Sequence, residues 1–193
     1  MFKPSKTVSR EFFHHLVSSH ELGHDGFHGK DHWLRVLHNA REIAAETGAN
    51  LRVLELFAVL HDSQRQNENH DPEHGHRAAA YAEEIRGTWF ELADDEMELL
   101  VEACRYHSDG IVEARPTVQA CWDSDRLDLG RVGVRPDPRF LCTSFAKRPE
   151  VIEAAFVRSN QGVLMHTSDL NPSALQLTLQ KLQDDWGENF REY

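Results

Sequence analysis

The amino-acid sequence predicts an all-α protein. Apolar residues recur at three-and-four spacing through most of the chain, and the segments between these stripes repeatedly begin with a cap residue followed by Pro or acidic residues. Alternation of apolar and polar residues, which is typical of half-buried strands, is scarce. At 193 residues the chain is long enough for one domain that buries its own core.

The first strong helical stripe runs from about Asp31 to Gly48, and Gly48 suits the left-handed position that ends a helix. Asn50 is a favourable N-cap for a second helix, which continues through His61. The short connection between the two predicts an antiparallel pair of helices.

Three further helices follow from similar signals. Asp71 is the predicted N-cap and Pro72 the first residue of one helix, and Asp94 opens the next, which ends at His107. Another is expected to follow Pro116 and to continue to about Leu129, before a Gly- and Pro-rich connection.

The weaker C-terminal signals, at Pro149 and at Asn171-Pro172, predict two more helices. We therefore expect an N-terminal helical extension over residues 1–27, a helical core over 28–135, and a C-terminal helical appendage over 136–193 that packs on the core.

Composition excludes several classes of protein. The chain has 21 Lys and Arg against 32 Asp and Glu, a net charge of −11, which disfavours a nucleic-acid duplex as partner. The sequence contains neither an apolar run long enough to span a bilayer nor a signal-peptide pattern, so a cytoplasmic protein without a membrane partner is expected. Cys104, Cys121 and Cys142 lack CxxC spacing and are expected to be small apolar residues.

The 13 histidines direct attention to metal chemistry, although most are expected to be unremarkable. Those of the N-terminal segment show no repeated ligand spacing and are interpreted as solvated or packing residues: His14, His15, His20, His24 and His28. His38 follows His32 by six positions, about 240° round a helix, and is expected to be exposed. His70 and His166 are expected in loops.

The pair His61-Asp62 stands out because it ends a strongly apolar helix. Phe57 and Ala58 precede His61 by four and three positions, so the imidazole shares the face of core residues. An antiparallel pair of helices brings the start of one beside the end of the next, and His32 and His61 are therefore expected to meet.

A carboxylate for the same site is expected from Cys121-Trp122-Asp123-Ser124-Asp125. Asp125 follows Cys121 by four positions and shares its apolar face, whereas Asp123 lies about 200° away from that face. Two imidazoles with the carboxylates of Asp62 and Asp125 form a mixed nitrogen and oxygen set that suits Mn, Fe, Co, Ni, Zn or Mg.

His32, His61-Asp62 and Asp125 resemble the H…HD…D signature of the HD-domain superfamily of metal-dependent phosphohydrolases. The flanks also resemble the family: His32-x-x-Arg35-Val36 is similar to "HxxRV", and Asp123-Ser124-Asp125-Arg126-Leu127 is similar to "DADRL", with Ser124 in place of the usual Ala. The resemblance implies an HD-domain-like helical bundle with one bound divalent metal ion, or two.

His74, in a segment similar to the family's "HG" segment, and His107 correspond to histidines that hold a second metal in dinuclear members. His76 is an alternative to His74, but two residues of separation point the two side chains to different sides of a helix.

The resemblance further implies hydrolysis of a small phosphorylated substrate, a phosphomonoester, a nucleotide or a phosphodiester, through a metal-activated water. Asp62 and Arg35 are the expected catalytic residues. Candidates for binding the phosphate are Arg35, Arg65, Arg77 and Arg126, each of which is otherwise an ordinary surface ion pair. Alternative acid or base groups are Glu68, Asp71 and Glu73.

Two other functions remain open from the sequence. A di-iron HD-type oxygenase is permitted by His74 and His107, and a regulator that binds a nucleotide or metal without turnover is the second alternative. The sequence predicts neither the particular substrate nor the oligomeric state.

Overall fold

The prediction of an all-α fold is confirmed by the computed structural model, which describes residues 3–23 and 26–161. These residues form seven α-helices and two short 3-10 helices, η1 and η2, joined by turns and loops, and no strand lies among them. The α-helices are α1 (Arg10–Ser19), α2 (Lys30–Thr47), α3 (Leu51–Leu60), α4 (His74–Ile85), α5 (Asp94–Tyr106), α6 (Pro116–Arg126) and α7 (Pro149–Gln161). The expected helix at Asn171-Pro172, the loop position of His166 and the environment of His24 lie outside the described residues.

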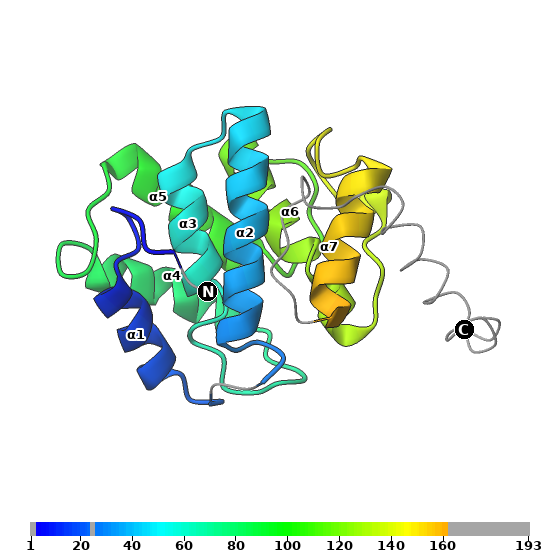
Figure 1. Ribbon diagram of the computed structural model, residues 1–193. Coiled ribbons are helices and arrows are strands. Elements are labelled where there is room, and N and C mark those ends of the chain that lie inside the picture. Colours follow the sequence, from blue (N-terminus) through cyan, green and yellow to red (C-terminus); the bar gives the residue numbers. More distant parts are fainter. Residues whose placement is uncertain (1–2, 24–25, 162–193) are drawn as a thin grey trace.

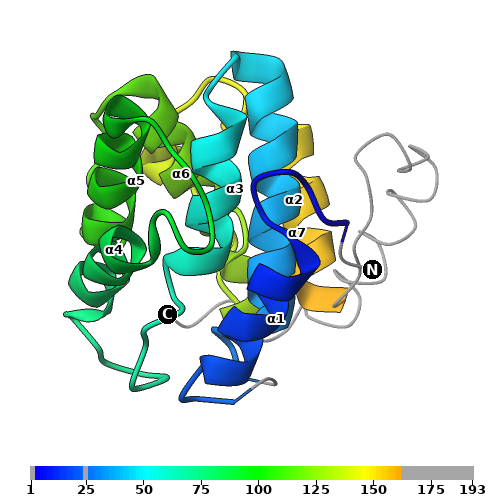
Figure 2. The same ribbon diagram turned by 90° about the vertical axis from the view of Figure 1, so that its left-hand side faces the viewer.

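The antiparallel pair α2 and α3 forms the centre of the molecule (Figures 1 and 2). Gly48 ends α2 in the left-handed conformation, with φ 73°, and its N–H donates to the Ala44 carbonyl at 3.0 Å. The side chain of Asn50 then accepts hydrogen bonds from the N–H groups of Arg52 and Val53 and caps α3. Every residue from Val53 to Leu60 is buried, so α3 is enclosed on all sides.

The other helices surround this pair. The helices α4 and α5 pack against one another beside α3, and α6 contacts α2, α3 and α5. On the opposite side α7 lies along α2 and contacts η1 (Leu129–Val132), while α1 covers the end of the bundle where α2 begins (Figure 1). The polar side chains of the site described below therefore lie between five helices.

Two helix limits were wrong. The helix expected to start at Pro72 begins at His74, because the Asp71 carboxylate does not cap it: Asp71 accepts the Gln66 N–H at 2.8 Å and pairs with Arg77 at 2.6 Å. The helix expected to reach Leu129 ends at Arg126, and the chain continues into the separate η1.

The expectation that His38 is exposed was also wrong. Its side chain is 12% exposed, with Nε2 3.4 Å from a Glu42 carboxylate oxygen one turn later. Cys104 and Cys121 are buried as expected, and Cys142 is partly buried. Burial raises the pKa of each of the three thiols, to about 12 in the case of Cys142.

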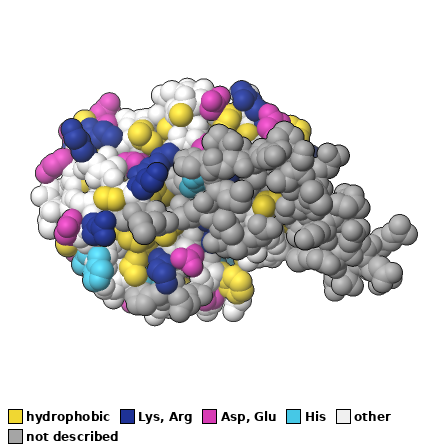
Figure 3. Space-filling model, in the orientation of Figure 1, with side chains coloured by type: hydrophobic (Ala, Val, Ile, Leu, Met, Phe, Trp, Pro, Cys, Tyr) yellow, Lys and Arg dark blue, Asp and Glu magenta, His cyan; other side chains and the backbone are white. Residues whose placement is uncertain are grey.

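The surface carries both charges. On the face seen in Figure 1, Lys and Arg side chains are interspersed with Asp and Glu over the parts that Figure 3 colours. Within the described residues, no helix combines the length and apolar character needed to cross a bilayer.

Candidate metal centre

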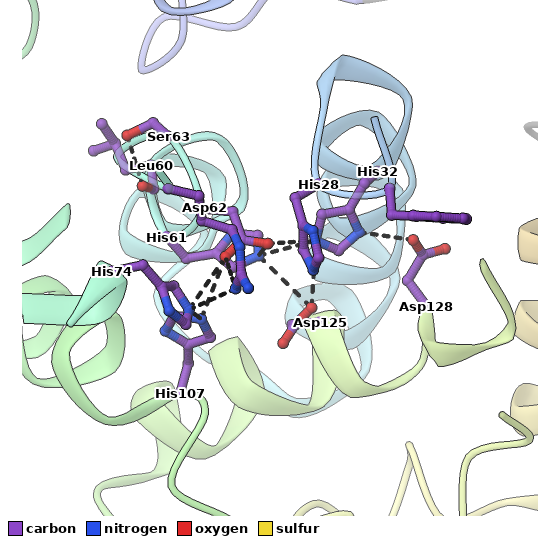
Figure 4. A network of polar contacts seen from close by, with 12 residues as sticks. His28, His32, Leu60, His61, Asp62, Ser63, His74, His107, Asp125 and Asp128 are labelled. Atoms are coloured by element: carbon purple, nitrogen blue, oxygen red, sulfur yellow. Dashed lines mark hydrogen bonds and ion pairs between the residues drawn. The ribbon is translucent and has the colours of Figure 1, made fainter. Parts of the chain in front are cut away.

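Four imidazoles and two carboxylates converge between the helices (Figure 4). His32 lies in the first turn of α2, His61 and Asp62 directly follow α3, and Asp125 belongs to the last turn of α6. His74 is the first residue of α4, and His107 directly follows α5. All four histidines and Asp62 are at least nine-tenths buried.

Two of the imidazoles face one another in a first cluster. His32 Nε2 lies 3.1 Å from His61 Nε2. Asp62 Oδ2 is 3.4 Å from the first of these nitrogens and 3.6 Å from the second, and Asp125 Oδ1 lies at the same two distances. The four residues of the sequence signature thus lie together in the structure.

A second cluster shares Asp62 with the first. His74 Nε2 lies 2.8 Å from His107 Nε2, and Asp62 Oδ1 is 3.3 Å from the former and 3.6 Å from the latter. Each oxygen of the Asp62 carboxylate therefore serves one pair of histidines. His76 points elsewhere, with a side chain that is 51% exposed.

Gly75 makes the second cluster possible. A Cβ at this position would lie 2.6 Å from the Cys104 carbonyl oxygen and 2.9 Å from that of Arg105, both in the backbone of α5. The absence of a side chain allows the first turn of α4 to lie directly against the last turn of α5, and this brings His74 to His107.

The other nitrogen of each ring already has a partner. The Nδ1–H of His32 donates to Asp128 Oδ2 at 2.7 Å, that of His61 to the Phe57 carbonyl at 3.1 Å, that of His107 to the Cys104 carbonyl at 2.7 Å, and that of His74 to the Asp71 carbonyl. With Nδ1 protonated, each neutral ring presents the lone pair of Nε2. Two lone pairs that face each other beside carboxylate oxygens repel one another, and a cation bound between them would remove this repulsion.

A polar atom without a hydrogen bond points to the same cation. Asp125 Oδ1 is buried and has no hydrogen-bond partner among the described residues. Without a metal ion, burial alone would raise the pKa of Asp62 and of Asp125, but protons on the neighbouring histidines, His61 foremost, outweigh it and hold both pKa values well below the usual range. The two carboxylates in turn raise the pKa of His61 against the effect of its burial. A divalent ion in place of these protons would meet a set of neutral nitrogen and anionic oxygen donors that fits it.

Comparisons with known proteins identify the family of the chain. A family model described as the HD domain matches residues 29–153 of the chain. The chain belongs to the HD-domain family. The resemblance seen in the sequence is thereby confirmed.

The fold has a counterpart among solved structures. This HD domain is similar to the crystal structure of a predicted HD superfamily hydrolase from an uncultured Thermotogales bacterium, with a TM-score of 0.63 and 24% sequence identity over 92% of each chain. The likeness shows the HD-domain fold. Comparison with curated proteins gives no significant match.

The arginines expected to bind phosphate have protein partners in the HD domain. Arg35 Nε donates to Asp128 Oδ1 at 2.7 Å, and its Nη2 to Asp128 Oδ2 at 3.1 Å. Arg65 Nη1 lies 3.2 Å from His74 Nε2 and 3.5 Å from Asp62 Oδ1, at the second cluster.

The other two arginines bind partners outside the two clusters. Arg77 pairs with Asp71, and Arg126 donates to the Phe140 and Ile111 carbonyls at 2.9 and 2.7 Å. The structure thus brings Arg65 to the clusters and holds Arg77 and Arg126 through other partners.

Sequence reasoning missed two charged residues of the site. Asp128 is 1% exposed and binds both His32 and Arg35, and Arg131 Nη2 lies 3.8 Å from Asp125 Oδ1. A signal was available for Asp128 alone: its spacing of three positions after Asp125 would keep it on one side of a continuing helix, but the helix ends at Arg126. The six positions between Asp125 and Arg131 would place Arg131 on another side.

A third omission lies in the N-terminal histidines. His28 Nδ1 is 2.6 Å from Glu68 Oε2, and the His28 ring stands edge-on to that of His32 with centroids 6.2 Å apart (Figure 4). Burial lowers the pKa of His28, against the opposing charges of Asp62 and Glu68. No sequence spacing indicates this pairing, because 40 residues separate the two partners.

Proposed function

We propose that this HD-domain protein is a metal-dependent phosphohydrolase that acts on a small phosphorylated molecule. The observation that carries the proposal is the sharing of Asp62: each of its two oxygens faces a separate pair of Nε2 lone pairs. A site that can gather two divalent ions around one carboxylate suits the transfer of an anionic phosphoryl group to water.

The donor residues form two groups, one for each ion. His32, His61, Asp62 and Asp125 would hold the first, and His74 and His107 with Asp62 would hold the second. The donor set favours Mn, Fe, Co, Ni, Zn or Mg rather than a soft thiophilic ion. A bound ion would lower the pKa of a coordinated water and neutralise charge on phosphoryl oxygens.

We assign substrate access to a cleft of about 550 Å³ that is lined in part by Arg35, Glu68 and Arg131. This volume suits a small molecule. Arg131 connects the cleft to the first cluster, since its Nη2 lies 3.8 Å from Asp125 Oδ1. The net charge of −11 supports a small phosphorylated substrate rather than a nucleic-acid duplex.

Proton transfer is assigned to the pair His28 and Glu68. Of the three acid or base groups considered from the sequence, Asp71 is bound by Arg77 and the Gln66 N–H, and the side chain of Glu73 is 70% exposed beside His76. Glu68 instead holds His28 against His32, and it also lines the cleft. A carboxylate that fixes an imidazole next to the reacting site is an arrangement suited to moving a proton.

The test is a metal analysis of the purified protein together with a panel of phosphomonoesters, nucleotides and phosphodiesters, assayed with several divalent ions. We expect bound metal and metal-dependent phosphate release, both lost in Asp62→Ala and both retained in Asp95→Ala, a change at the surface of α5. Phosphate release by metal-free Asp62→Ala would contradict the assignment. Oxygen consumption by an iron-loaded protein without hydrolysis would favour the oxygenase, and nucleotide binding without turnover would favour the regulator.

A further inference from the structure

Arg131 is the cation of the cleft that reaches furthest toward the first cluster. Among the described residues that line the cleft, Arg35 and Arg131 are the two arginines, facing the acidic residues Asp31 and Glu68. Both oxygens of Asp128 bind Arg35, at Nε and Nη2. Arg131, by contrast, places Nη2 3.8 Å from Asp125 Oδ1, the buried oxygen that has no hydrogen bond.

The backbone holds the Arg131 side chain in place. Its Nε donates to the Phe27 carbonyl at 3.1 Å, and Nη1 donates to the Asp128 carbonyl at 3.2 Å. The side chain is 9% exposed. The two carbonyl contacts orient the guanidinium before any ligand arrives, and the distance from Nη2 to Asp125 is too long for a hydrogen bond.

The negative charge around the cleft makes the fixed orientation of the Arg131 guanidinium important for binding an anion. Asp31 and Glu68 on the walls, with Asp62 and Asp125 at the cluster, repel an anion that approaches. Arg35 offsets little of this repulsion, since it donates two hydrogen bonds to Asp128, whereas Arg131 Nη1 lies 4.0 Å from the same carboxylate. A planar guanidinium fixed at the boundary between the cleft and the metal ligands is the group that the chain offers to a phosphoryl oxygen.

We propose that Arg131 is a substrate-binding residue, whose Nη2 donates to a non-bridging phosphoryl oxygen of the substrate in the cleft. This inference rests on the proposed function for its substrate class. It assigns to Arg131 the phosphate contact that the sequence suggests for other arginines.

The experiment measures binding of inorganic phosphate to the Mn²⁺-loaded full-length protein by isothermal titration calorimetry. In Arg131→Gln we expect at least tenfold weaker phosphate binding, with the Mn²⁺ content per chain unchanged. Arg131→Lys, which keeps the charge without the planar fork, should lie between the two. Arg115→Gln is the matched control: Arg115 precedes the other end of α6, ten residues from Asp125, and binds Glu102.

The possible results separate this inference from the proposed function. Weakened phosphate binding in Arg131→Gln, in a protein that hydrolyses none of the phosphate esters tested, would support Arg131 as an anion-binding residue and contradict the phosphohydrolase. Unchanged phosphate binding and an unchanged KM, in a protein that does hydrolyse one, would overturn the role of Arg131 alone. Loss of Mn²⁺ from both Arg131→Gln and Arg131→Lys would also overturn it, since Arg131 would then act through Asp125.

Discussion

The Nδ1 atom of His32 lies 2.7 Å from Oδ2 of Asp128, although 96 residues separate the two in the chain. The same carboxylate receives both Nε and Nη2 of Arg35. Asp128 therefore balances the positive charge of Arg35 while it fixes the tautomer of His32, a proposed metal ligand. Carboxylates in this position behind a ligating histidine increase its basicity and hold its orientation.

Asp128→Asn should therefore weaken metal binding without removing a ligand. The amide has the shape of the carboxylate but no charge, so the His32 ring loses its anionic partner and Arg35 loses its counter-ion. We expect metal affinity to fall about 10- to 100-fold, as measured by competition with a fluorescent chelator. Asp137→Asn, which alters a carboxylate paired with Arg139 in the exposed η2 (Pro138–Phe140), is the control. Equal affinities in the two variants would refute this role of Asp128.

The presence of a second pair of histidines, His74 and His107, leads us to expect two metal ions per chain. His107→Gln removes one of the two Nε2 donors of the second cluster but leaves His32, His61 and Asp125 unchanged. We expect the wild-type protein to bind two ions per chain at saturation and the variant to bind one, by elemental analysis after exhaustive dialysis. A single ion in the wild-type protein would show that the second cluster is not a metal site. His76→Gln, an exposed neighbour on α4, should bind as many ions as the wild type.

Much of the fold could be predicted because its signals are local. Gly48 and Asn50 mark the turn between α2 and α3 through their own backbone and side-chain hydrogen bonds, and neither depends on distant residues. The predicted start of α4 was wrong because the expected cap interacts with a residue farther along the chain. Asp71 is a good cap by residue type, but Arg77, six positions later, competes for its carboxylate.

The site was predictable as far as helical geometry extends. Antiparallel helices were enough to bring His32 to His61, and helical phase was enough to select Asp125 over Asp123. Arg131 and Asp128 follow the end of α6, where no periodic pattern indicates direction. His28 reaches the site through Glu68, a tertiary contact that no spacing within the chain announces.

The stability of the metal-free protein should depend on pH through His74. Burial, reinforced by the charge of His107 and opposed by that of Asp62, lowers the pKa of His74 from 6.5 to about 4. Between these two values the unfolded chain binds a proton that the folded protein does not, so the contribution of His74 to the free energy of unfolding falls as the pH drops through this window. Below about pH 4 the decline from this group ends, because both states are protonated.

Urea unfolding of chelator-treated protein at pH 7, 5.5 and 4.5 tests this dependence. Other groups titrate in the same range, so the quantity of interest is the difference between the wild type and His74→Gln, which cannot take up this proton. The wild-type advantage should shrink as the pH falls. A difference that is constant from pH 7 to 4.5 would show that the pKa of His74 is ordinary.

Asp123 and Asp125 lie two positions apart on α6, and substitution by Asn should affect different properties at the two positions. We expect it to lower the free energy of unfolding at Asp123 and the metal content at Asp125. Asp123 is fully buried, and its oxygens accept the N–H groups of Cys142 and Thr143 and the Thr143 hydroxyl, all at 2.7 Å. In Asp123→Asn the amide must turn an NH₂ group toward one of these donors, so we expect a loss of roughly 2 kcal/mol in the free energy of unfolding. Its metal content should be unchanged, because the carboxylate ties α6 to the segment after η2. Asp125→Asn removes the charge from the oxygen that faces His32 and His61, and metal content should fall from two ions per chain to one, the ion of the second cluster. Measurement of metal content and urea unfolding on both variants decides the matter: metal loss in Asp123→Asn with retention in Asp125→Asn would reverse the assignment of the ligand.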